Sequence, residues 1–431
     1  MRPFFRSLKQ GGESRQIVSW ALYDWANSAY ATVVIAGFFP IFFKQYWAAD
    51  LSVTESTYQL GVANAVASLV IMVFAPLLGA VADQGSARKK FLLFFALMGI
   101  VMSGGLFFIE QGNWALAIII YILATIGFMG GNLFYDSLLL QVAPEKRFDR
   151  VSALGYGLGY LGGGVIFAGM VMMSLWPTSF GLNDASEAVR ISFICVALWW
   201  GVFSIPLWLF VKEPKRAGNL SMWQCVSGGW QQLRQTLHEI RQLKVVMLFL
   251  LAYWLYIDGV DTIVRMAVDY GLSLGFDSNG LIVALLITQF VGFPAAILFG
   301  RLGQRYGAKT GIFIAIAVYI GITIWASLIE TQIEFYGLAV MIGLVQGGIQ
   351  SLSRSLYARL IPPGKSAEFF GFYNMLGKFA AVAGPLMMGW IAVATESHRV
   401  AILSLLILFC AGAVLLWFVD EKAGRQARAS L

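Results

Sequence analysis

The chain has 431 residues, of which 59% are hydrophobic and 12% charged. Soluble domains carry about 25% charged residues, so the composition excludes an ordinary soluble protein and predicts an all-α protein that crosses a membrane many times. The net charge of +7 does not require a nucleic-acid partner, because Lys and Arg collect in cytoplasmic loops of membrane proteins.

The sequence offers little for cofactor or metal chemistry. Its three cysteines, Cys195, Cys225 and Cys410, lie far apart without a CxxC pair, and there are only two histidines. A disulfide framework or a histidine-rich metal site is therefore not expected. No GxxxxGK[ST] motif occurs, so we expect neither an ATP site nor any other cofactor.

Apolar runs separated by polar or Gly/Pro breaks predict twelve membrane-spanning helices. They cover about 17 to 44, 57 to 82, 91 to 110, 113 to 142, 151 to 176, 189 to 211, 245 to 270, 279 to 301, 310 to 329, 335 to 360, 369 to 394 and 399 to 419.

The predicted first helix carries polar residues inside an apolar run. Asp24, Asn27 and Ser28 share one face, and Tyr30 follows. The run could imitate a secretory signal, but it is too long and has no convincing small-residue cleavage site before Phe43, so we expect it to be retained. An intramembrane carboxylate is costly, which favours a proton-titrating or amine-binding site over a purely structural hydrogen-bonding cluster.

The distribution of basic residues predicts the orientation. Lys44, Arg190 and Arg399 fall in loops on one side of the twelve spans, and nearly all the other Lys and Arg residues outside the spans fall on the opposite side. That second side should be the cytoplasm, with both termini in it. We expect a bacterial cytoplasmic (inner) membrane protein that acts as a monomer.

One long connection divides the helices into two sets of six. We expect an N-terminal bundle (1–211), a cytoplasmic linker (212–244), and a C-terminal bundle with a short tail (245–431). Apolar residues recur in the linker at three- and four-residue steps: Trp223, Val226, Trp230, Leu233, Leu237 and Ile240. This pattern fits an amphipathic helix on the membrane surface, and equally a flexible tether with one helical piece.

Three matched places indicate an internal duplication. Tyr23, Asp24, Asn27 and Ser28 are echoed by Tyr256, Asp258, Asp261 and Thr262, with Ile257 inserted. The spacing from Gly79 to Asp83 recurs from Gly300 to Gln304. A gap-free match aligns Asp136 with Arg354 and Pro144 with Pro362.

The predicted seventh helix presents a stripe of alternating charge at Asp258, Asp261, Arg265 and Asp269. Arg265 lies one turn from Asp261, so Asp261 is a candidate structural partner and Asp258 the better candidate to titrate. From the predicted boundaries, Asp258 lies roughly 20 Å deep and Asp24 only roughly 10 to 14 Å. Either the seventh helix begins later or the duplication is not strictly symmetric.

Two further spans add candidate residues. Asp136 and Arg354 each lie eight residues before the matched proline, where an ion pair could gate the inner side. Arg354 could instead hold a substrate carboxylate, or the pair could be static. Gln350 precedes Arg354 by one turn. Lys378 is too deep in the eleventh helix to reach water, and Asn374 lies one turn away.

The fifth helix is rich in glycine, with Gly155, Gly159 and Gly163 at four-residue spacing. Close helix packing explains this pattern better than a nucleotide-binding loop, because no strand, turn and helix surround it.

These features carry a family resemblance. GAVADQGSARKK, with Asp83 and Arg88, and its weaker repeat GRLGQRYGAK, with Arg305, resemble the gating loops of the major facilitator superfamily, although Gln84 and Gln304 depart from the pattern. WALYDWANSAYATVV, SALGYGLGYLGGG, LLAYWLYIDGVDTI and GLVQGGIQSLSRSLYARLIP are similar to its autophagy-related vacuolar effluxer branch, also called the unknown major facilitator family.

The resemblance implies a carrier of two pseudo-symmetric six-helix bundles that moves a small solute by alternating access; fungal relatives are associated with release of amino acids from the vacuole. Protons could drive the cycle. A lipid, amphiphile or drug exporter of the same fold, a non-transporting sensor and an intramembrane aspartyl hydrolase are the alternatives.

Overall fold

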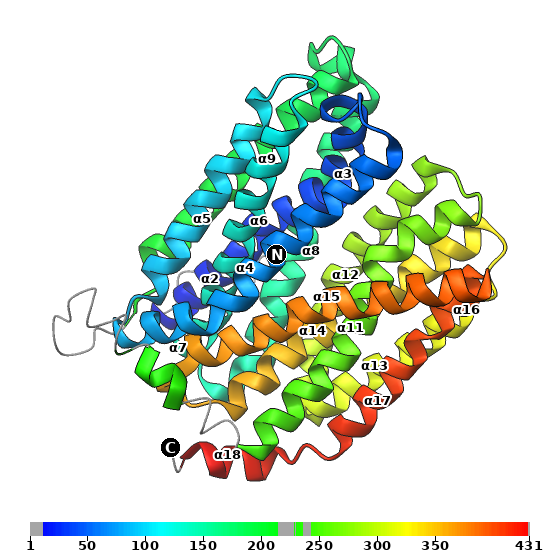
Figure 1. Cartoon of the computed structure of the whole chain (residues 1–431). Helices are drawn as coiled ribbons and strands as arrows, with labels where there is room; N and C mark the ends of the chain where they lie inside the picture. Colours follow the sequence, from blue (N-terminus) through cyan, green and yellow to red (C-terminus); the bar gives the residue numbers. More distant parts are fainter. Residues whose placement is uncertain (1–11, 214–227, 229, 236–242, 430–431) are drawn as a thin grey trace. The chain divides into compact units, whose positions relative to one another are not determined.

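The computed structural model describes residues 12–213, 228, 230–235 and 243–429, and these are nearly all helical (Figure 1). Eleven helices in this part of the chain are long and apolar enough to cross a membrane. The remaining predicted span corresponds to α15 (Ser366–Thr395), a 30-residue helix with Pro385 in its interior. The predicted all-α membrane-spanning class is therefore confirmed.

The helices follow the predicted spans, with ends that differ by at most about five residues. The first six spans correspond to α2 (Gly12–Ala29) with η1 (Tyr30–Phe38), α3 (Phe39–Phe42) and η2 (Phe43–Trp47), then α4 (Val53–Gln84), α5 (Arg88–Gly105) with η3 (Leu106–Phe108), α6 (Trp114–Ser137) with α7 (Leu139–Val142), α8 (Phe148–Leu175) and α9 (Ala185–Phe210). The others are α11 (Lys244–Ser273), α12 (Ser278–Tyr306), α13 (Ala308–Ala326), α14 (Gln332–Leu360), α15, and α16 (His398–Leu403) with α17 (Leu405–Trp417). A further short helix, α18 (Glu421–Ala429), ends the described chain.

Polar side chains in the loops define several helix starts. Thr331 and Glu334 form a reciprocal capping box at the start of α14. Before α4, the Ser52 hydroxyl donates to Glu55 Oε2 over 2.8 Å and the Ser52 amide over 3.0 Å, and these two bonds lower the pKa of the Glu55 carboxyl. Such caps satisfy amides that have no partner within the helix.

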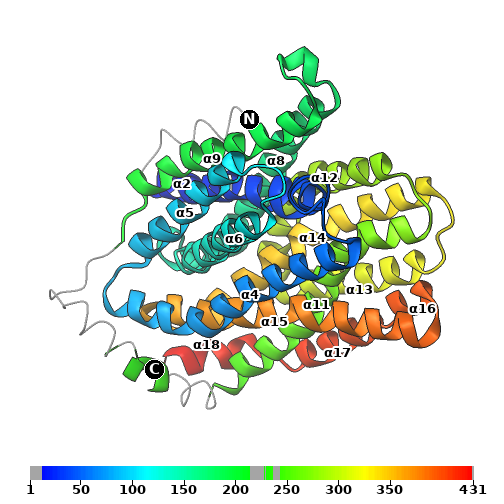
Figure 2. The same ribbon diagram turned by 45° about the horizontal axis from the view of Figure 1, so that its top comes forward.

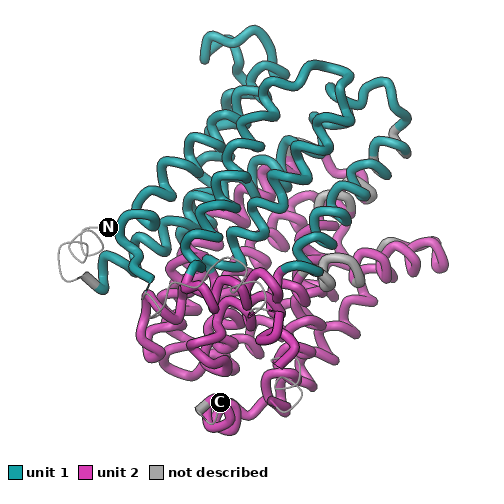
Figure 3. The backbone as a smooth tube through the Cα atoms, turned by 60° about the vertical axis from the view of Figure 1, so that its left-hand side comes forward, with its two compact units in different colours: residues 1–74, 87–135, 158–214 teal, residues 75–86, 136–157, 215–431 magenta. Residues whose placement is uncertain are grey.

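The chain divides into two compact units, coloured separately in Figure 3. Unit 1 comprises Met1–Phe74, Ala87–Tyr135 and Leu158–Pro214, and within it α9 packs against α2 and α5. Unit 2 comprises Ala75–Ser86, Asp136–Gly157 and Lys215–Leu431. Within unit 2, α14 packs against α12 and α13, and α11 packs against α15 and α17 (Figure 2).

The glycines of α8 lie where neighbouring helices approach closely. A Cβ at Gly159 would be 2.7 Å from Ser28 Oγ, and one at Gly162 would be 2.6 Å from the Trp25 carbonyl oxygen. Both contacts lie within unit 1. They confirm the packing interpretation of this glycine-rich helix at these two positions.

Candidate functional site

The residues aligned by the gap-free repeat match, Asp136 and Arg354, form an ion pair in unit 2. Arg354 Nη1 lies 2.9 Å from Asp136 Oδ1, and the two residues are 1% and 7% exposed. Asn374 of α15 donates to the other carboxylate oxygen of Asp136 over 3.3 Å. The predicted pair is thus present, with one guanidinium and one amide on a single carboxylate.

Residues at the start of α8 complete the surroundings of Arg354. Its Nε donates to Ser152 Oγ over 2.8 Å and its Nη2 to the Ser152 carbonyl oxygen over 2.9 Å. The Tyr156 ring lies 4.3 Å from the guanidinium carbon. A planar guanidinium suits this combination of a carboxylate, a serine and an aromatic face.

A second buried ion pair lies one to two turns away along α14. Arg359 donates from both terminal nitrogens to Asp149, over 2.8 and 2.6 Å, and Ser355 Oγ donates to the same carboxylate over 2.5 Å. Arg359 and Asp149 are 6% and 3% exposed. Two-point Arg–carboxylate bonding of this kind is strong and directional.

A third carboxylate joins the end of α4 to the start of α15. Asp83, 3% exposed, accepts hydrogen bonds from the amides of Ala367 and Glu368 over 3.2 and 2.9 Å. A carboxylate is favoured here because the first-turn amides of a helix lack internal partners and carry partial positive charge. We call Asp83, Asp136, Asp149, Arg354 and Arg359 the ionic cluster of unit 2.

The helices joined by Asp83 also meet through glycine. A Cβ on Gly371 of α15 would lie 2.7 Å from the Ala75 carbonyl oxygen and 2.7 Å from Pro76 Cα in α4. No side chain fits between the two backbones at this point.

Gly371→Val is therefore expected to force α4 and α15 apart and to lower the melting temperature in detergent, consistent with an overpacking cost of about 1 to 3 kcal/mol. Gly389→Val, at a position where an added Cβ would meet no atom within 4 Å, is the matched control. Equal melting temperatures for the two variants would contradict the close approach.

Asp258 is buried separately from the ionic cluster, between α11 and α15. It is 1% exposed, and its Oδ1 accepts from the Gly384 amide over 2.8 Å and from the Thr262 hydroxyl over 3.4 Å. Its Oδ2 finds no hydrogen-bond partner among the described residues. A Cβ on Gly384 would lie 2.6 Å from Asp258 Oδ1, so only glycine allows this approach.

Asp24 lies in a cluster of unit 1 that is built differently. Its Oδ2 accepts from the Tyr135 hydroxyl over 2.9 Å, and Asn27, 1% exposed, donates to Asn132 over 2.5 Å. Tyr30, the first residue of η1, shares a 2.8 Å hydrogen bond with Thr125. The contacts join the first predicted span to α6, whereas Asp258 contacts α15, so the echoed carboxylates have different partners.

The predicted helix boundaries imply different depths for Asp24 and Asp258, but in the structure this difference is small. α2 is already helical at Gly12 and α11 begins at Lys244, so Asp24 and Asp258 lie roughly 18 and 21 Å from those helix positions at 1.5 Å per residue. Of the two alternatives left open by the sequence, a later start of the seventh helix does not hold, because α11 begins one residue before the predicted boundary. The first helix extends further toward the N-terminus instead.

The other predicted site residues are more dispersed. Asp261 and Gln350 are half-buried, Arg265 is exposed, and exposed Arg305 stacks on Tyr306 at 5.3 Å. The amide of Arg88, in unit 1, donates to Glu213 over 2.9 Å. The side chains of Lys378 and Asp269 lie outside the described residues.

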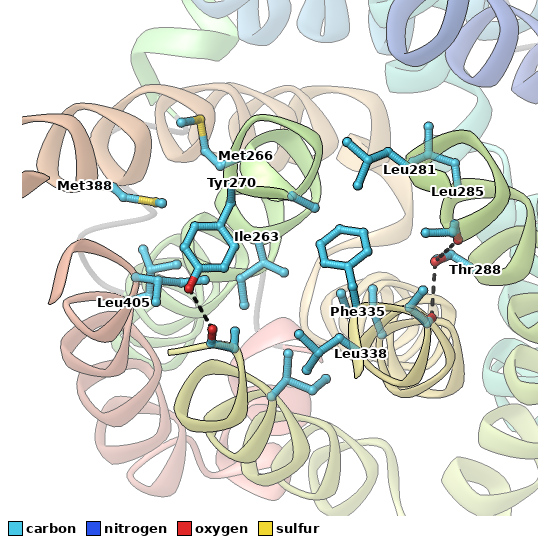
Figure 4. A pocket seen from close by; sticks show the side chains of 17 residues that line it. Ile263, Met266, Tyr270, Leu281, Leu285, Thr288, Phe335, Leu338, Met388 and Leu405 are labelled. Carbon is cyan, nitrogen blue, oxygen red and sulfur yellow. Dashed lines mark hydrogen bonds between the residues drawn. The ribbon is translucent and has the colours of Figure 1, made fainter. Parts of the chain in front are cut away.

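Unit 2 also contains an apolar cavity of about 50 Å³ (Figure 4). Its lining includes Ile263, Met266, Phe335 and Met388, while Tyr270 donates to the Ala326 carbonyl and Thr288 to the carbonyls of Ala284 and Ala339. Its polar side chains are therefore already hydrogen-bonded to backbone. The cavity has no charged lining residue and does not suit a charged solute.

Several residues of the site were missed from the sequence. Asp149 and Arg359 are not among the predicted site residues, since Asp149 lies between two predicted spans and Arg359 at the end of another. Ser152 and Tyr156 have no partner in the repeat alignment. Glu213 follows α9, where its carboxylate accepts from the first amides of α5 over 2.9 and 3.0 Å. A search for acidic residues near helix starts could have signalled Asp149, which lies in the first turn of α8, but not Glu213, which reaches the start of α5 only through the fold. Among the described residues, no His, Cys, Asp and Glu side chains form a metal-binding group.

Apolar helices long enough to cross a membrane define a polytopic integral membrane protein. The chain belongs to the family described as vacuole effluxer Atg22 like, whose model matches residues 52–429. It is 40% identical over 418 residues to the uncharacterized MFS-type transporter YxiO of Bacillus subtilis, covering 95% of this chain and 96% of that protein. It is 25% identical to autophagy-related protein 22 of Coccidioides immitis, with coverage of 94% and 87%.

Solved structures give the same fold. The human organic anion transporter MFSD10 matches with a TM-score of 0.72 at 16% identity, covering 94% of this chain and all of that chain. The proton:xylose symporter XylE matches with a TM-score of 0.73 at 13% identity, covering 97% and 98%. The chain is thus an integral, multi-pass MFS-type transporter, and not an enzyme.

Proposed function

We propose that this transporter moves a small zwitterionic solute, such as an amino acid, by proton-coupled alternating access in a bacterial inner membrane, acting as a monomer. The ionic cluster of unit 2 is the observation that carries the proposal. Buried ion pairs add little net stability, because desolvation offsets much of their attraction. A buried ion pair that forms in one conformational state and separates in another would instead have a role in the transport cycle.

The cluster serves as a gate on the cytoplasmic side in this proposal. The three acidic residues come from α4, the end of α6 and the start of α8, while Arg354 and Arg359 come from α14. Separation of these elements would break the pairs and open a path to the solute. The concentration of Lys and Arg in the loops at this end of the helices supports a cytoplasmic location, with both termini on that side.

The proposed solute class follows from charge complementarity. In the open state, Arg354 and Asp136 are released from each other, and the freed guanidinium and carboxylate complement the carboxylate and the amine of a zwitterion. Asp258 would carry the coupling proton, because it is buried and its Oδ2 lacks a described partner. The family description as effluxers agrees with transport out of a compartment.

A thermal-shift screen against amino acids, peptides, sugars and amphiphiles tests the proposal. It is followed by counterflow measurements in proteoliposomes at about pH 5.5 and about pH 7.5. Stabilisation by amino acids, with uptake driven by an inward proton gradient, is expected. A response to amphiphiles alone would favour the exporter alternative, which the apolar cavity of unit 2 supports. Ligand binding without counterflow would favour a sensor.

A further inference from the structure

The described part of the linker contributes the Gln232 side chain to the region around Asp83. In its described part, residues 228 and 230–235, Gln232 is 9% exposed, whereas the neighbouring Gln231 is exposed and Trp230 is 63% exposed. The predicted apolar stripe mostly falls outside the described residues, and its membrane-surface role stays a prediction. On this turn, the buried side chain is a polar one.

Both the oxygen and the nitrogen of the Gln232 side-chain amide form hydrogen bonds. Its Oε1 accepts from Gln84 Nε2 over 2.5 Å, and its Nε2 donates to Glu368 Oε2 over 2.6 Å. Gln84 ends α4 and Glu368 lies in the first turn of α15. The linker amide therefore bridges the same two helices that Asp83 joins through the amides of Ala367 and Glu368.

We propose that Gln232 is a positioning residue for the transport cycle, which holds α4 and α15 together while the gate is closed. The role of the gate rests on the function proposed above, whereas the bridge itself does not. An amide side chain can both accept from Gln84 and donate to Glu368, which a lysine, an arginine or an ionised carboxylate cannot do. It is uncharged, so its burial when the helices close costs less than the burial of an ion would.

The bridge also gives a physical role to Gln84, which departs from the basic residue usual in this family's loop. A Lys or Arg at position 84 could also donate to the linker amide, but its positive charge would draw it to the Glu368 carboxylate. The amide at position 84 instead donates to the linker. The closed gate would then depend on the connection between the two halves of the chain as well as on the membrane-spanning helices.

Amide hydrogen exchange of the 366–371 segment in the full-length protein tests the bridge, because the amides of Ala367 and Glu368 are bonded to Asp83. Gln232→Ala is expected to speed exchange in this segment about tenfold, the effect of losing one charge-assisted hydrogen bond. Gln231→Ala, which alters an exposed glutamine next to it, should leave exchange unchanged. Exchange in α13 reports whether either variant is globally destabilised.

A charge variant separates the bridge from simple packing. Gln232→Glu places a carboxylate beside Glu368 and should speed exchange more than Gln232→Ala, and adding Glu368→Gln should restore slow exchange. Equal exchange in Gln232→Ala and Gln231→Ala, or no rescue in the double variant, would overturn the proposal. The measurement needs no substrate, so it stands apart from the identity of the solute. If the bridge is present but amino acids are not carried, only the proposed function fails.

Discussion

Arg354→Ala is expected to reduce transport in proteoliposomes by at least about tenfold and to lower the melting temperature. The variant leaves Asp136, 7% exposed, without its guanidinium and removes two hydrogen bonds to Ser152. Removal of one partner from a buried pair costs about 3 to 5 kcal/mol, because the other charge stays desolvated. The state in which this pair is closed should therefore be depleted.

The double variant Asp136→Asn, Arg354→Ala separates a broken ion pair from a lost contact. It removes the stranded charge, so it should recover part of the melting temperature that Arg354→Ala loses. Transport should remain low, because the closed state still lacks its pair. Arg301→Ala, at an exposed arginine of α12, is the control for loss of a positive charge. A double variant no more stable than Arg354→Ala would show that Asp136 is not stranded.

The gate and the substrate interpretations of Arg354 predict different effects on the maximum transport rate and on KM. A residue that only closes the gate affects the maximum rate while the solute KM changes little. A residue that also binds the solute carboxylate raises KM when it is removed. Measurement of both quantities for Arg354→Lys, which keeps the charge but loses the planar fork, distinguishes the two roles.

The helical spans could be predicted well from the sequence because each depends on a local apolar run of sufficient length. The Asp136–Arg354 pair could also be predicted, since the duplication marks the two residues as equivalent and they carry opposite charges. The bonding of Asp258 to Gly384 could not, because it joins α11 to α15 across 126 residues and depends on the missing Cβ of a glycine.

Other features of the site depend on contacts between elements, which the hydropathy of a single span does not encode. Arg359 and Asp149 lie at helix ends and look like solvated charges until α14 and α8 are packed together. Gln232 belongs to a linker whose apolar residues predict a helix on the membrane surface. The buried amide of Gln232 itself gives no hydropathy signal. The π-helix η1 at Tyr30–Phe38 is set by backbone hydrogen bonding within an ordinary apolar sequence.

Asp258→Asn is expected to abolish solute accumulation driven by a proton gradient while exchange of labelled for unlabelled solute falls by no more than about threefold. The amide keeps the shape of the side chain, and its oxygen can still accept from the Gly384 amide, as Asp258 Oδ1 does over 2.8 Å. It cannot bind and release a proton. Loss of coupling with retained exchange is the result expected when a buried carboxyl carries the driving proton and the solute binds elsewhere.

Asp50→Asn, at an exposed aspartate outside the predicted spans, is the control for loss of a carboxylate and should leave both activities unchanged. If Asp258→Asn abolishes exchange as well, Asp258 binds the solute itself, as the amine-binding alternative requires. If accumulation persists in the variant, the coupling proton is carried elsewhere, and the half-buried Asp24, held by Tyr135 in unit 1, becomes the carboxylate to test. Burial alone would then be a poor guide to the coupling site, because Asp24 is the more exposed of the two carboxylates.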